Sequence, residues 1–145
     1  MKKQLIIIAF ISGSFFSCTK EKAKTDPVVE KTNILTDGVW HFTDYKYNGG
    51  IANTITTYND LPGCRQDDLR SFYKDGTGEI NEGPTKCNST DPQSQSVQWK
   101  FLDNHALSIQ LNGEEYYIDK LETHEFRFHR KIIPFTADIS YGFSR

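Results

Sequence analysis

Four histidines and two pairs of adjacent carboxylates are the residues whose types suit chemistry most directly. His124 and His129 are five positions apart, an odd offset that places them on opposite faces of a strand. No two of the four histidines have the spacing of zinc ligands. Asp67-Asp68 and Glu114-Glu115 also point to opposite faces if they lie on strands, so neither pair suits paired acid and base catalysis. We therefore expect no metal site and interpret the histidines as surface residues.

Sequence motifs for catalysis or for binding of a phosphorylated cofactor are missing as well. No serine lies in a nucleophile-elbow pattern, and Gly76-Thr77-Gly78 is a turn fragment rather than a dinucleotide-binding fingerprint. The formal net charge is −2, without a run of like charges long enough to indicate a nucleic-acid partner. We expect a protein that is not an enzyme, carries no cofactor and binds no nucleic acid.

The N-terminus has the pattern of an export signal. Lys2-Lys3 precedes an apolar run from Leu5 to Ile11, which suits a signal peptide and is shorter than the roughly 20 residues of a membrane span. Phe15-Phe16-Ser17-Cys18 then resembles a bacterial lipobox, with Phe15 in place of the usual leucine. We expect residues 1–17 to be a lipoprotein signal peptide and Cys18 to be acylated, which would attach the chain to a membrane. An ordinary signal peptide followed by an unrelated cysteine is the alternative.

The cysteine count agrees with this interpretation. The chain has three cysteines, and an odd number in an exported protein leaves one thiol to explain. Acylation of Cys18 leaves Cys64 and Cys87 as a pair in a compartment where disulfides persist. A bridge between them would close a loop of about two dozen residues and stabilise the fold by roughly 3 kcal/mol. No thiol would remain for nucleophilic chemistry.

Residues 18–33 and residues 34–145 differ in composition. The first stretch is mainly Lys, Glu, Ala, Thr, Asp and Pro, and such a segment buries too little apolar area to fold. We expect it to be a flexible tether behind the acylated cysteine. The length of the remainder fits a single domain, and we assign residues 34–145 to it.

The domain is rich in short alternating segments. The chain has 10 Phe, 7 Tyr and 2 Trp but one Met, and aromatic side chains favour pleated sheets. Apolar and polar residues alternate over Val97–Phe101, over Leu107–Leu111 and over residues 135–143, and Asn112-Gly113 is a strong hairpin signal. The pattern predicts eight or nine antiparallel strands in an all-β barrel or sandwich, with no helix.

Three segments resemble a known family. Gly38-Val39-Trp40 resembles the Gly-x-Trp opening of lipocalins and related calycin barrels. The segment Cys64–Thr77, with Glu82–Pro92 and its Cys87, is similar to the lipocalin-like lipoproteins of the Bacteroidota. Trp99-Lys-Phe101 and the residues up to Leu121 follow the second half of that family.

The resemblance covers about residues 34–145 and implies an antiparallel up-and-down lipocalin-like barrel of eight or nine strands. It also implies a Cys64–Cys87 bridge near one rim. In calycin barrels the tryptophan of the first strand packs against a basic side chain from the last strand. Arg145, or else Arg130, would take that role for Trp40.

The interior of an eight-stranded barrel is either filled by side chains or holds one small ligand, and the sequence leaves both open. Core or ligand-lining candidates are the large residues expected to point inward: Trp40, Phe42, Phe72, Ile80, Trp99, Phe101, Leu107, Ile109, Leu111, Tyr116, Ile118, Phe126, Phe128, Ile139, Tyr141 and Phe143.

Two functions follow as hypotheses. The first is a membrane-anchored lipoprotein of the cell envelope that binds a small hydrophobic or amphipathic ligand. It would lie in the outer membrane, on the periplasmic face or at the cell surface. The second is a surface module with a fully packed core, which would contact a protein or glycan through outward-facing Tyr45, Tyr47 and Tyr58. The sequence does not indicate the ligand or the oligomeric state.

Overall fold

The structure is a computed structural model that describes residues 25–49, 54–132 and 137–145. The strands of these residues form one antiparallel sheet in the order β2-β1-β3-β4-β5-β6-β7-β8-β9, and a further pairing of β1 with β9 closes it into a barrel. Eight strands complete the barrel and β2 is additional, so the prediction of an all-β, up-and-down antiparallel barrel is confirmed. The strands are β1 (Val39–Gly49), β2 (Thr54–Thr57), β3 (Leu69–Phe72), β4 (Thr77–Asn81), β5 (Ser94–Phe101), β6 (Ser108–Leu111), β7 (Glu114–Glu122), β8 (Glu125–Ile132) and β9 (Ala137–Ser144).

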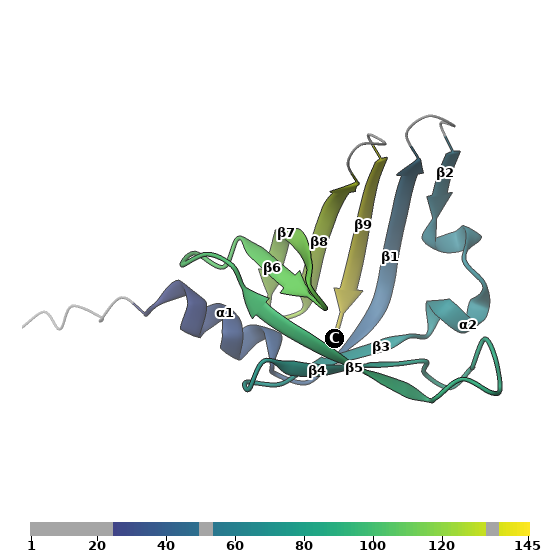
Figure 1. The fold of residues 1–145 in the computed structure, drawn as a ribbon, viewed down its shortest axis with the longest axis horizontal. Coiled ribbons are helices and arrows are strands. Elements are labelled where there is room, and N and C mark those ends of the chain that lie inside the picture. The colour runs from purple at the N-terminus through teal and green to yellow at the C-terminus, as the bar shows by residue number, and fades with distance from the viewer. Residues whose placement is uncertain (1–24, 50–53, 133–136) are drawn as a thin grey trace, which may run out of the picture.

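Strand β1 organises the closure because it pairs with three other strands. One edge of β1 pairs with β9 over residues 41–48. The other edge is shared, since residues 39–41 pair with β3 and residues 46–49 pair with β2. In Figure 1, β7, β8, β9, β1 and β2 rise side by side while β3, β4 and β5 cross beneath them. The segment between β2 and β3, which includes α2 (Gly63–Gln66), descends beside β1 toward the start of β3 (Figure 1).

A β-bulge in β1 changes which residues face the interior. The register with β9 shifts between Phe42 and Asp44, so Thr43 is the extra residue. Before the bulge the even-numbered Trp40 and Phe42 are buried. After the bulge the inward face passes to odd-numbered residues, beginning with Tyr45, because an inserted residue breaks the alternation of a strand.

The expectation that Tyr45 and Tyr58 face outward is wrong, for Tyr45 because of the bulge and for Tyr58 because of its place in the turn after β2. Tyr45 is half-buried and packs against the core, with its ring centroid 6.4 Å from that of Phe42. Tyr58 begins the 3₁₀ turn η1 (Tyr58–Asp60), and its hydroxyl donates to the backbone oxygen of Gln66 at 2.7 Å. Tyr47 is also half-buried. Tyr45 and Tyr58 thus belong to the packing of the barrel rather than to an exposed contact surface.

Helix α1 (Pro27–Leu35) precedes the barrel and packs against β7. The side chain of Asp26 accepts a hydrogen bond from the Val28 backbone N–H at 2.8 Å and so caps the first turn. Pro27 has the fixed φ that suits the first helical position. Leu35, at the other end, is fully buried in the core.

The prediction of a chain without helices is therefore wrong, and the stretch expected as a tether is helical from Pro27 onward. Composition suggested a solvated chain because few residues there are apolar. The Asp26-Pro27 start signal and the burial of Leu35 outweigh that composition. Two shorter pieces, η1 and α2 (Gly63–Gln66), lie between β2 and β3. The expected signal peptide and Cys18 lie outside the described residues.

Trp40 is held at one end of the barrel by α1 and by the end of the chain. It is fully buried, and its indole Nε1 donates to the backbone oxygen of Leu35 at 2.8 Å. The Arg145 guanidinium lies over the indole, 4.4 Å from the ring centroid. The basic residue implied by the family resemblance is thus Arg145, since Arg130 lies over Tyr116 instead.

The core is dominated by aromatic side chains. Most of the sixteen core or ligand-lining candidates belong to this core. The buried ones are Trp40, Phe42, Phe72, Trp99, Ile109, Leu111, Phe126, Phe128 and Phe143, and those partly buried against the same cluster are Ile80, Phe101, Tyr116, Ile118 and Tyr141. Leu107, which was expected to point inward, is instead 63% exposed. It precedes β6 and belongs to a turn in which its backbone N–H donates to the Asp103 carboxylate. The alternation of β6 therefore does not extend to it.

Cys64 and Cys87 form the expected disulfide, with their Cα atoms 5.1 Å apart. The bond joins α2 to the loop that follows β4. Asp67 adds a second link between the same segments, because its carboxylate accepts a hydrogen bond from the Thr85 backbone N–H at 3.0 Å. The bridge and this hydrogen bond together hold the α2 segment against the barrel.

Candidate functional site

The interior of the barrel is mostly filled by side chains but encloses a small cavity. Its volume is about 110 Å³, well below the roughly 300–1,000 Å³ of pockets that bury a drug-sized ligand. Strands β1, β3 and β9 form part of the wall, and the segment from Leu61 to Asp68 forms the rest. The lining residues are Phe42, Tyr45, Leu61, Arg65, Asp68, Arg70, Tyr141 and Phe143.

Arg70 is the unusual member of this lining. It pairs in register with the inward-facing Trp40, so its side chain points into the barrel. Its guanidinium carbon lies 4.9 Å from the ring centroid of Phe143 and 5.7 Å from that of Tyr141. Among the described residues it makes no ion pair with a carboxylate. The cavity is therefore lined by a guanidinium whose neighbours are aromatic faces.

Burial changes the titration of the groups around this cavity. It lowers the pKa of the Arg70 guanidinium, which still stays charged because arginine titrates so far above neutral pH. Burial likewise raises the pKa of the Asp68 carboxyl, while Arg65 and Arg70 act in the opposite direction. The pKa of Tyr141 rises to about 12, again mainly because of burial. The Tyr141 hydroxyl is consequently protonated at neutral pH and remains a hydrogen-bond donor.

Sequence reasoning did not single out Arg70, although a signal for it was present. Arg70 and Phe72 are two positions apart on the short strand β3, so they share a face. Phe72 was expected to be an apolar anchor and is buried. The same alternation therefore predicts that Arg70 faces the interior. What the alternation does not predict is the lack of a carboxylate partner.

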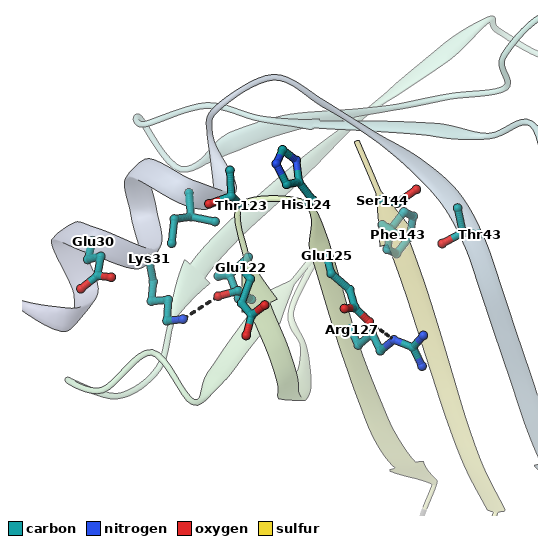
Figure 2. A pocket seen from close by; sticks show the side chains of 12 residues that line it. Glu30, Lys31, Thr43, Glu122, Thr123, His124, Glu125, Arg127, Phe143 and Ser144 are labelled. Carbon is teal, nitrogen blue, oxygen red and sulfur yellow. Dashed lines mark hydrogen bonds and ion pairs between the residues drawn. The ribbon is translucent and has the colours of Figure 1, made fainter.

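A larger depression lies on the surface, between α1 and the β7–β8 turn (Figure 2). Its volume is about 770 Å³, but several of its charged groups already have partners. Lys31 donates to the backbone oxygen of Leu121, and Glu125 pairs with Arg127 at 2.6 Å. Figure 2 draws both interactions as dashed lines among the side chains that line the depression. Because these groups already have partners and the depression is open to solvent, we place the candidate site in the interior cavity instead.

The histidines and paired carboxylates considered first do not come together. His124 is exposed in the turn between β7 and β8, and His129 contacts the Asp119 carboxylate through Nδ1 at 2.8 Å. Glu114 pairs with Arg130 across the wall. Within residues 25–49, 54–132 and 137–145, no group of three or more His, Cys, Asp or Glu side chains is placed to hold a metal ion.

Comparison of the sequence with known families and curated proteins found no match. No protein-family model matches the chain, and no curated protein does either. The fold itself is a closed eight-stranded antiparallel barrel, which is consistent with a calycin-like fold. In the part of the chain that the structure describes, no helix has the length and apolar character needed to cross a membrane.

Proposed function

We propose that this protein is a lipocalin-like binder of a small hydrophobic or amphipathic ligand, with the cavity beside Arg70 as its binding site. The observation that carries the proposal is this cavity, which combines apolar walls with a few convergent polar groups. Binding sites for small molecules commonly have that combination. The cavity volume of about 110 Å³ favours a short ligand or the end of a longer one.

The proposal extends to the cellular location of the protein. The Gly38-Val39-Trp40 opening, the Cys64 and Cys87 segments, and the N-terminal pattern before Cys18 resemble lipocalin-like lipoproteins of the Bacteroidota. On this basis the chain is an outer-membrane lipoprotein anchored by acylated Cys18, and it acts by binding rather than by catalysis. The alternative of a surface module loses the argument that motivated it, because Tyr45 and Tyr58 pack against the core.

The test blocks the cavity and leaves the rest of the barrel intact. The exported protein is titrated with 1-hexanol and with hexanoate, and binding is followed by NMR shifts of the backbone amides. Leu61→Trp places a large ring at the lining, and Leu102→Trp adds the same ring at a position outside it that is 39% exposed. We expect binding of at least one probe, lost in Leu61→Trp and retained in Leu102→Trp. Failure of both probes to bind the unaltered protein would refute the proposed function.

A further inference from the structure

The pairing of β7 with β8 ends before either strand does. The last paired residues at that end are Tyr117 and His129. Beyond them, β7 still extends to Glu114 and pairs with β6, and β8 extends to Ile132 and pairs with β9. The two facing edges have no further pairing with each other, and a depression of about 380 Å³ lies where they separate. Its lining residues are Glu114, Glu115, Tyr117, Arg130, Lys131 and Ile132.

The charged groups around this depression balance one another. Glu114 and Arg130 form an ion pair, so Glu115 and Lys131 are the charged lining residues that remain. These two would be direct neighbours if the β7–β8 register continued, and opposite charges at such positions usually interact. In the described part of the chain they form no ion pair with each other. The depression is therefore bordered by an exposed carboxylate and an exposed ammonium group, with no net charge.

Tyr117 adds an aromatic surface to the lining. It is 50% exposed. Its ring stacks on that of His129 with the centroids 5.6 Å apart, and Nδ1 of His129 lies 2.8 Å from a carboxylate oxygen of Asp119. Ser108, the cross-strand neighbour of Tyr117 on β6, is too small to cover the other side of the ring. The ring is thus supported on one side and open on the other, and a ring held in this way loses little freedom when it binds a ligand.

These features together indicate the chemistry of a ligand. The balanced charges favour a neutral molecule, because an ion of either sign would meet one like charge. The carboxylate and the ammonium group favour a molecule with hydroxyl groups, since a hydroxyl both donates and accepts hydrogen bonds. An apolar molecule would displace water from both groups without replacing its hydrogen bonds. The aromatic ring favours a flat face of C–H groups, and a pyranose sugar combines all of these properties.

We propose that the depression between β7 and β8 binds a neutral saccharide, with a pyranose ring against Tyr117. The carboxylate of Glu115 accepts hydrogen bonds from sugar hydroxyls, and the ammonium group of Lys131 donates to them. His129 and Asp119 act by positioning the Tyr117 ring. This site is separate from the interior cavity, so the inference does not depend on the function proposed for that cavity.

The first experiment compares sugars with an open-chain polyol. The unaltered exported protein is titrated with cellobiose, maltose, sorbitol and glycine, and binding is followed by NMR shifts of the backbone amides. At least one disaccharide should bind with a Kd on the order of 1–10 mM and shift the amides of residues 114–117 and 130–132. Sorbitol has the hydroxyls without the ring and should bind about tenfold more weakly. Absence of binding by both disaccharides, equal binding of sorbitol, or tighter binding of the zwitterion glycine would overturn the inference.

Variants then test the role of Tyr117. Tyr117→Ala removes the ring and should weaken disaccharide binding by about tenfold, whereas Tyr117→Phe keeps the ring and should retain the affinity. Tyr73→Ala is the matched control, because Tyr73 is 47% exposed and lies outside the lining; it should leave the affinity unchanged. Folding of each variant is checked by its amide spectrum. Disaccharide binding that survives unchanged in folded Tyr117→Ala would refute the assignment of the site.

Discussion

Trp40 and Arg145 should stabilise the barrel as a coupled pair, and this can be measured with Trp40→Phe, Arg145→Met and the double variant. Trp40→Phe removes the indole N–H that donates to the Leu35 oxygen at 2.8 Å. It leaves a buried acceptor without its partner, at a cost of about 1–3 kcal/mol. The smaller ring also leaves a void around a side chain that is fully buried, which adds about 1 kcal/mol. We expect Trp40→Phe to lower the free energy of unfolding by about 2–4 kcal/mol.

Arg145→Met should cost less, because methionine keeps an apolar side chain over the Trp40 ring at a position where the arginine side chain is 11% exposed. It removes the guanidinium that lies 4.4 Å from the indole centroid and the hydrogen bond from Nε to the Thr123 oxygen. We expect a loss of about 1–2 kcal/mol. Because the two residues touch, the loss in the double variant should fall short of the sum of the single losses by about 0.5–1 kcal/mol.

Urea unfolding followed by circular dichroism gives the three free energies of unfolding. Tyr117→Phe is the surface control, since Tyr117 is 50% exposed and its change should stay within about 0.5 kcal/mol. Two results would contradict the reasoning. One is a Trp40→Phe loss no larger than that of the control, and the other is strict additivity of the two single variants.

Two further predictions concern the loops. Cys64→Ser removes a disulfide that spans 23 positions and should lower the free energy of unfolding by about 3 kcal/mol. Reduction of the unaltered protein should reproduce this loss in urea unfolding. Equal urea midpoints with and without reductant would contradict the prediction. Asp103→Asn should cost about 1 kcal/mol at neutral pH, since backbone hydrogen bonds hold the pKa of this solvent-accessible carboxyl at about 2, below its ordinary 3.8. The stabilisation by the ionised Asp103 carboxylate should be fully present above pH 4–5 and should be lost as the pH falls toward 2. A difference in urea midpoint between the unaltered protein and Asp103→Asn that does not change with pH would contradict the assignment.

Much of the barrel could be predicted from local pattern. The alternation over Val97–Phe101 gives β5 its buried face, with Val97 and Trp99 inward. The Asn112-Gly113 pair marks the turn between β6 and β7, where both residues have positive φ. These signals act over a few residues, so they are visible without knowledge of the neighbouring strands. The same holds for the Asp26-Pro27 start of α1, a local helix signal that is present in the sequence although the composition of residues 18–33 favoured a flexible tether.

The candidate site was less predictable because it depends on register between distant strands. Tyr45 faces inward because the pairing of β1 with β9 contains a bulge at Thr43, and no local pattern in residues 39–49 shows it. The inward direction of Arg70 follows from its alternation with Phe72. Its lack of an ion-pair partner among the described residues depends on which side chains other strands bring near it.

By itself, the sequence determined the strand periodicity and the antiparallel class, because each is a matter of residue type and short spacing. The cysteine pair followed from the cysteine count, and the family resemblance supplied Arg145 or Arg130 as the basic partner of Trp40. Only the tertiary structure decided that the interior is mostly filled, that a small cavity remains among the described residues, and that Arg70 lines it. Those outcomes depend on how the volumes of side chains from β1, β3, β9 and the α2 segment fit together. Packing of that kind is a property of the closed barrel and not of any single segment.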